Sequence, residues 1–167
     1  MLAFALTLIL VYGGSRTSRH LPFVLVVTGY YSFKECPGLT NPTVGMELGE
    51  SYSFVQEDIS NWYHPMGFAY FPDGHHANKP ELEPINTQTG SSCVNNYTCP
   101  TPRYLKNGGF LGKAGTGDYG LDAYMPAFFT GLPDWVAAGS YSVELTFDDA
   151  NYTSDIFYFC HVRSKQP

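Results

Sequence analysis

The chain has few charged side chains and especially few basic ones. Only 14% of its 167 residues are charged, nine are Lys or Arg, and the formal net charge is −6. Binding to nucleic acid or to an anionic membrane surface needs a clustered basic face, whereas these basic residues are scattered along the sequence. The composition therefore argues against both partners. Hydrophobic residues still make up 44%, which is enough for one globular domain with its own core.

A long hydrophobic run is also lacking. The N-terminal stretch Met1 to Val11 is apolar at all but one position and leads into small residues at 13–15. It is too short to span a bilayer, and an apolar run that ends in small residues is typical of a secretory signal. We predict a signal peptide over 1–15 and a single domain over 16–167. An N-terminal strand or a ragged gene start is the alternative, because no basic residue precedes the run.

Cysteine is scarce, with four in the chain. Cys93 and Cys99 bracket a short loop, and we predict that they form a disulfide of an oxidising compartment. Asn96 and Asn151 each begin an Asn-x-Thr acceptor, which favours a secreted, extracellular glycoprotein. Two cysteines are left that could form a second bridge, or one of which could be a thiol kept for a metal: Cys36 and Cys160.

Helical periodicity is hard to find anywhere in the sequence. Apolar residues alternate with polar ones, and Gly or Pro punctuates them at short intervals, which predicts an all-β sandwich. Residues 156–161 are apolar on both alternating faces, which predicts a central strand. Residues 72–120 are rich in Asn, Gly, Pro, Thr and Ser and predict a long loop-rich insertion. The strand regions that we predict are 21–33, 44–56 with a hinge at 48–50, 67–71, 140–147 and 156–161.

Two residues of types that commonly bind metals stand at the ends of predicted strands. His64 precedes the strand at 67–71, and Cys160 closes the strand at 156–161. Copper combines thiolate and imidazole ligands, and a trigonal set of two His and one Cys with a weak axial Met marks an electron-transfer site. The sequence therefore offers the two anchors of such a site.

The C-terminal third of the sequence resembles the last hairpin of the cupredoxin family. A Gly-x-Tyr strand from Gly139, a turn and a Tyr-x-Cys strand ending at Cys160 carry the resemblance, and His64-Pro65 resembles the first histidine ligand of that family. The resemblance covers residues 44–71 and 132–162. It implies an antiparallel Greek-key β-sandwich that binds copper through His64 and Cys160, transfers electrons and has a redox partner protein.

The sequence departs from the family after Cys160. A second histidine and then a methionine follow the cysteine in the family, whereas Arg163 and Gln166 stand near those positions here. A guanidinium stays protonated and offers no lone pair to a metal. The remaining candidate ligands are His161, which strand alternation places on the opposite face from Cys160, and Met66, the second residue after His64.

A function of a different class stays open. A metal-free secreted interaction or carbohydrate-binding domain on the same scaffold would have Cys160 inert or bridged to Cys36, and would bind through aromatic residues such as Trp62 and Trp135. Catalytic motifs give no competing interpretation: residues 115–120 fit the dinucleotide glycine pattern without the strand and helix that it requires. The sequence thus predicts binding rather than an enzyme activity.

Overall fold

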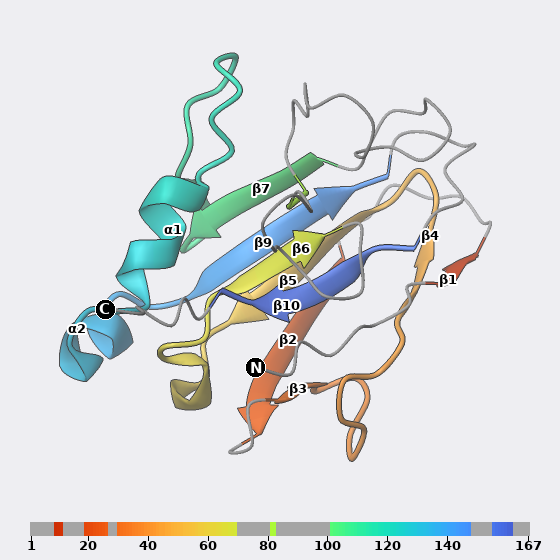
Figure 1. Ribbon diagram of the computed structural model, residues 1–167, viewed down its shortest axis with the longest axis horizontal. Helices are drawn as coiled ribbons and strands as arrows, with labels where there is room; N and C mark the ends of the chain where they lie inside the picture. The colour runs from red at the N-terminus through yellow and green to blue at the C-terminus, as the bar shows by residue number, and fades with distance from the viewer. Residues whose placement is uncertain are drawn as a thin grey trace.

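The computed structural model describes residues 9–11, 19–26, 30–69, 81–82, 101–147 and 155–161 (Figure 1). Strands dominate, and two short α-helices and one 3-10 turn join them. The elements in chain order are β1 (Ile9–Val11), β2 (Arg19–Val26), β3 (Tyr30–Phe33), β4 (Gly45–Glu47), β5 (Ser51–Gln56), η1 (Ile59–Asn61), β6 (Met66–Ala69), β7 (Thr101–Lys106), β8 (Gly109–Phe110), α1 (Leu121–Ala127), α2 (Leu132–Ala137), β9 (Tyr141–Thr146) and β10 (Phe157–Cys160).

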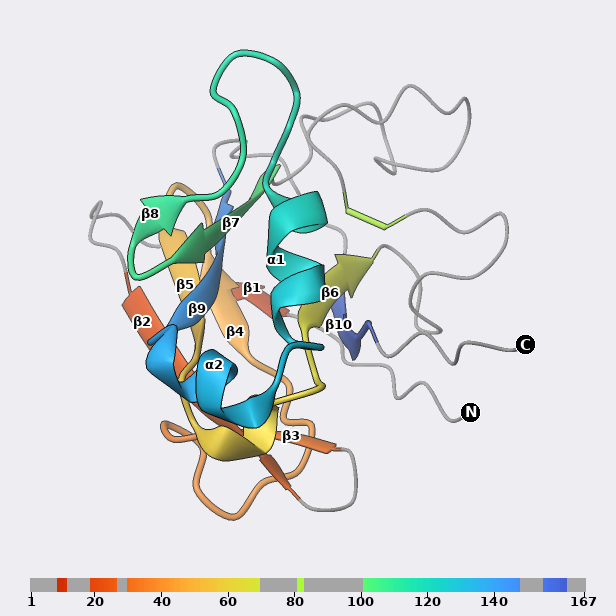
Figure 2. The ribbon, with the colours of Figure 1, turned by 90° about the vertical axis from the view of Figure 1, so that its left-hand side faces the viewer.

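The molecule is built around one large sheet and a smaller pair of strands. The large sheet has the order β3-β2-β5-β9-β7-β8, and β6 and β10 form a separate antiparallel pair. Figures 1 and 2 show this pair lying against one face of the large sheet. Aromatic side chains fill the space between the layers: Phe33 meets Tyr158 at 5.5 Å between ring centroids, and Phe54 meets Phe68 at 4.9 Å. The all-β prediction is confirmed.

Most of the pairings are antiparallel, but not all. Strand β2 runs parallel to β5, and β1 runs parallel to β4. The antiparallel arrangement that the resemblance implies therefore holds for most pairings of the described strands, but not for these two. Residues 9–11, within the predicted signal peptide, form β1, which is the strand alternative for that segment; the signal peptide itself stays a prediction. In the part of the chain that the structure describes, no helix is long and apolar enough to cross a membrane.

The alternation of apolar and polar residues correctly predicted the positions of the main strands. In β9, Tyr141, Val143 and Leu145 are buried in the core, and Glu144 and Thr146 are only partly buried. The predicted hinge at 48–50 separates β4 from β5, and Gly49 adopts a φ of 85°, which suits a residue without a Cβ. Strand period and turn chemistry were therefore sufficient to locate these elements.

The helices were not expected from the sequence. Helix α1 has seven residues and α2 has six, so neither completes two turns and neither shows a helical repeat. What they bury is a cluster of rings: Tyr124, Phe128 and Trp135 are each at most 1% exposed. Tyr124 and Phe128 lie four residues apart, the spacing of one helix face. Tertiary burial, rather than local periodicity, stabilises both helices.

Part of the predicted insertion is sheet. Within residues 72–120, β7 pairs along its whole length with β9, and β8 folds back on β7. The turn between them is Asn107-Gly108, with φ of 49° and 75° at the two residues. Asn-Gly is the strongest short signal for a hairpin, so this turn could have been predicted. Residues 72–80 and 83–100 lie outside the described residues, and so do Cys93, Cys99, Asn96 and Asn151.

Strand β10 is not central in a sheet. Among the described strands it pairs only with β6. Its two faces are both apolar because they meet different surroundings: Ile156 and Tyr158 are buried in the core, and Phe159 packs its ring on His161 at 4.6 Å between centroids. A double-sided apolar pattern can thus arise from burial under another layer as well as from a central position.

Candidate metal centre

The structure brings His64 and Cys160 together. Their Nδ1 and Sγ atoms lie 3.4 Å apart, although the residues are 96 positions apart in sequence. The pairing of β6 with β10 sets Cys160 opposite Met66, and the His161 N–H extends this pairing by donating to the Pro65 carbonyl at 2.9 Å. The end of β10 therefore meets the start of β6, where His64 stands.

His64 is presented by a tightly bonded loop. Asp58 caps η1 by accepting the Ser60 N–H at 2.9 Å and the Ser60 hydroxyl at 2.8 Å. The His64 N–H then donates to the Asn61 carbonyl at 2.9 Å. Tyr63 has a φ of 67°, in the left-handed region that a bulky residue rarely adopts. This turn sends the chain from η1 into β6 and directs the His64 side chain toward Cys160.

Burial and hydrogen bonding set the protonation states in this region. Desolvation lowers the pKa of the half-buried His64, which favours the neutral imidazole with a lone pair for a metal. Burial raises the pKa of Tyr31 well above its ordinary value, and the charge of Cys160 and a hydrogen bond to it add to the effect. The Tyr31 hydroxyl therefore keeps its proton, which it can donate to the His64 carbonyl at 3.2 Å.

The distance between the two donor atoms fits a shared metal. With metal–sulfur and metal–nitrogen bonds of about 2.3 and 2.0 Å at a tetrahedral angle, sulfur and nitrogen stand about 3.5 Å apart, and the observed separation is 3.4 Å. A hydrogen bond between thiol and imidazole accounts for the same distance. The donor set, one soft thiolate and one imidazole, is the set that copper prefers.

Further donors are sparse around this pair. Within the described residues, no group of three or more His, Cys, Asp or Glu side chains could hold a metal. Met66 is fully buried and stands directly opposite Cys160 in the β6–β10 register, which places both side chains on one face of the pair. Met66 is therefore the nearest candidate for a third, soft ligand. Arg163 and Gln166 lie outside the described residues.

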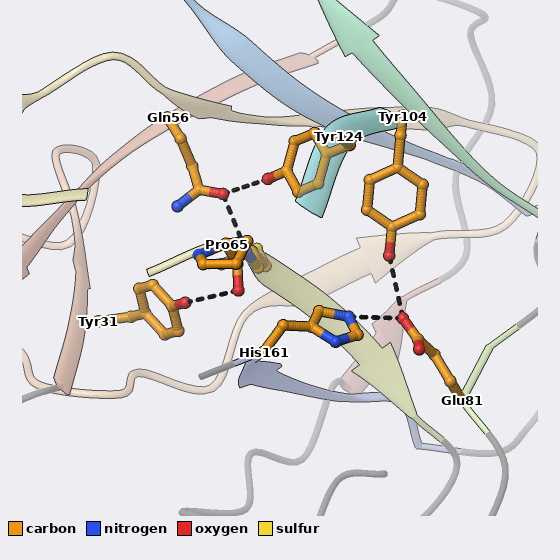
Figure 3. A network of polar contacts seen from close by, with 8 residues as sticks. Tyr31, Gln56, Pro65, Glu81, Tyr104, Tyr124 and His161 are labelled. Atoms are coloured by element: carbon orange, nitrogen blue, oxygen red, sulfur yellow. Dashed lines mark hydrogen bonds and ion pairs between the residues drawn. The ribbon is translucent and has the colours of Figure 1, made fainter. Parts of the chain in front are cut away.

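His161 has a different partner. Its Nε2 lies 2.7 Å from Glu81 Oε1, and both side chains are 5% exposed. The ring passes over Gly67, where a Cβ would collide with it. His161 thus packs on the face of β10 opposite to Cys160, as strand alternation requires. Figure 3 shows this pair together with Tyr104, whose hydroxyl donates to the same Glu81 oxygen at 3.3 Å.

No family model, curated protein or solved structure matches this chain. Neither Cys36 nor Cys160, the two cysteines in the part of the chain that the structure describes, forms a disulfide. The bridge between them that the sequence left open is absent.

Two buried polar residues near the site were not predicted from the sequence. Gln56 is fully buried beneath His64, and Glu81 is buried against His161. A signal for Gln56 was present, because it continues the buried alternate set of Tyr52 and Phe54 in β5. No comparable signal existed for Glu81, since only its return to pair with Ala69 brings it to the end of β6.

Proposed function

We propose that this chain is a secreted copper-binding protein of electron-transfer type on a cupredoxin-like Greek-key sandwich. The observation that carries the proposal is the 3.4 Å approach of His64 Nδ1 to Cys160 Sγ. Both donors stand where the family resemblance expects ligands, one before a strand and one at the end of another. Secretion is supported by the sequence alone, through the apolar N-terminus and the two glycosylation acceptors.

Copper supplies a one-electron couple when it is bound between a thiolate and an imidazole. This chain's residues would hold it without moving. Cys160 is the last residue of β10, and the His64 loop is fixed by the Asp58 cap and by the Asn61 carbonyl. Ligands on rigid elements keep their geometry better than ligands on loose loops. Such a site favours electron transfer, which requires little rearrangement between the two oxidation states.

A copper(II) titration of the purified protein tests this function. We expect a strong visible thiolate-to-copper band that saturates near one equivalent. The band should vanish in Cys160→Ser, weaken or shift in His64→Gln, and persist in Cys36→Ser, which removes the other thiol of the described region. A colourless titration, or an unchanged band in Cys160→Ser, would contradict the proposal.

The exposed aromatic residues favour the second function, an interaction domain without metal. Tyr63 is 44% exposed and Phe129 39%, and their rings meet at 5.5 Å between centroids. Trp62 packs edge-on against Tyr63 at an interplanar angle of 74°, so the cluster is no flat sugar platform. Trp135 cannot take part, since it is 1% exposed. Binding that is lost in Tyr63→Ala and kept in Cys160→Ser would support this function instead.

A further inference from the structure

We propose that Gln56 is a positioning residue that fixes the direction of His64 toward Cys160. The inference deepens the copper proposal and rests on it only for its copper measurements, because the orientation of His64 can be tested in the metal-free protein. It assigns a role to a buried polar side chain that lies at the end of β5, outside the ligand-bearing segments.

The Gln56 side-chain amide has all of its hydrogen-bonding groups occupied. It is fully buried, and its Nε2 donates to the His64 carbonyl at 2.6 Å and to Asn61 Oδ1 at 3.3 Å. Its Oε1 accepts the Met66 N–H at 3.0 Å and the Tyr124 hydroxyl (Figure 3). A primary amide has two N–H donors and two acceptor lone pairs. No water is needed to complete this set.

Two of these bonds hold the chain on both sides of Pro65. In one, the Gln56 Nε2 donates to the His64 carbonyl; in the other, the Gln56 Oε1 accepts the Met66 N–H. The proline ring already fixes its own φ, so the peptide planes on either side have little freedom. The Cα–Cβ bond of His64 is thereby directed, and its Nδ1 comes to 3.4 Å from Cys160 Sγ.

The competing explanation is that Gln56 only satisfies a buried polar region. The two roles make different demands on its four bonds. A purely structural residue would matter equally through its contact with Tyr124 and its contact with His64. A positioning residue acts through the His64 carbonyl and the Met66 N–H. Tyr124→Phe therefore provides a matched control, because it removes one partner of the same amide and leaves both backbone contacts in place.

The decisive variant is Gln56→Glu. Burial raises the pKa of a carboxyl group, and a protonated one would still donate to the His64 carbonyl, so the spectra are recorded at a pH where the introduced group is ionised. The ionised carboxylate can still accept from the Met66 N–H and the Tyr124 hydroxyl, but it turns an acceptor oxygen toward the His64 carbonyl. In metal-free protein, we expect the ring signals of His64 in nuclear magnetic resonance spectra to shift and broaden, and those of His161 to stay in place. Tyr124→Phe should leave the His64 ring signals unchanged. Unchanged His64 signals in folded Gln56→Glu would overturn the proposal.

A second variant and the wild type keep the test decisive if Gln56→Glu does not fold. Gln56→Met has similar volume and no hydrogen bonds, so it should displace His64 in the same way. In the wild type, the Gln56 amide protons should exchange slowly and show proximity to His64 and Asn61. Absence of that proximity would also overturn the assignment.

Copper binding gives the independent measurement. Removing a group that holds a ligand typically costs about 10- to 100-fold in metal affinity, and we expect a loss of this size in Gln56→Glu and none in Tyr124→Phe. A wild type that binds no copper would defeat the proposed function but would leave the His64 ring result intact. Equal copper affinities of wild type and Gln56→Glu would defeat the positioning role alone.

Discussion

His161 Nε2 lies 2.7 Å from Glu81 Oε1, and the Tyr104 hydroxyl reaches the same oxygen at 3.3 Å. Two buried side chains from segments far apart in sequence, His161 and Tyr104, thus meet at one buried oxygen of Glu81. A buried polar group is costly when it loses its partner and contributes modestly when it keeps it. This asymmetry makes Glu81 a sensitive test of the fold.

Glu81→Ala should strongly destabilise the protein. It leaves His161 and Tyr104 buried without their acceptor, and each such group costs about 1–3 kcal/mol. We expect the free energy of unfolding in urea to fall by about 2–6 kcal/mol. Glu57→Ala is the control, because its ion pair with Lys34 is half exposed and such pairs contribute about 0–1 kcal/mol. A similar loss in both variants would contradict this prediction.

Gly67→Ala should destabilise the same region by a steric route. The new methyl group would collide with the His161 ring and come within 2.9 Å of Phe159 Cζ. Overpacking of this kind costs about 1–3 kcal/mol, which urea unfolding can measure. Its cost should shrink when His161 is also replaced by Ala, because neighbouring substitutions are not additive. Additive costs in this double variant would show that the collision is absent.

Tyr31→Phe should alter the visible spectrum of the proposed copper site. The Tyr31 hydroxyl lies 3.2 Å from the His64 carbonyl and also hydrogen-bonds Cys160. Hydrogen bonds around a ligating sulfur tune a copper site, so we expect the visible band of the copper complex to shift.

Tyr158→Phe is the control for this prediction. Its hydroxyl is also buried and donates to a backbone carbonyl, that of Pro42, at 3.3 Å. Both variants should lose about 0.5–1.5 kcal/mol of stability, but only Tyr31→Phe should move the band. Identical spectra would contradict a role for Tyr31 at the site.

Asp58→Ala should destabilise the protein at neutral pH and much less in acid. The Ser60 N–H, and then its hydroxyl, hold the pKa of Asp58 below its ordinary value of 3.8. Because the folded-state pKa is the lower one, the stabilisation is present above pH 3.8 and is lost as the pH falls through the folded-state value.

The size of the Asp58 effect follows from its role as a cap. Loss of such a cap costs about 0.5–2 kcal/mol, which should appear in urea unfolding at pH 7 and fade near the acid end of the curve. Asp155→Ala, at an exposed position before β10 and outside any helix, should show no such fading. A pH-independent cost for Asp58→Ala would contradict the capping explanation.

The sequence predicted the strands because these depend on local pattern, and alternation located β9. His64 and Cys160 were chosen as ligands through the cupredoxin resemblance, and that role stays a prediction. The helices were not predicted because helices of six and seven residues are too short to show a helical repeat of apolar residues. The burial of Glu81 could not have been predicted, since a glutamate is expected at the surface unless the fold provides hydrogen-bond partners for it.

In the candidate site, too, some features could be predicted from the sequence and others depend on the fold. The cupredoxin resemblance implied that His64 and Cys160 lie at one site, and the structure places their Nδ1 and Sγ atoms 3.4 Å apart. His161 faces away from Cys160 because successive side chains along a strand point to opposite faces. Gln56 depends on how four segments converge on one buried amide. The sequence pattern cannot show which segments will meet at this amide. It could predict only that position 56 is buried, because of its place in β5.

The bridge between Ala69 and Glu81 has a consequence for how this protein can vary. The chain leaves β6 after Ala69 and returns beside the same strand, where Leu82 donates its N–H to the Phe68 carbonyl at 2.8 Å. The departure and return points are therefore fixed by backbone pairing, independently of what lies between them. We therefore expect β6 and β10 to keep their register in variants in which residues 70–80 are lengthened, shortened or replaced by a reporter peptide.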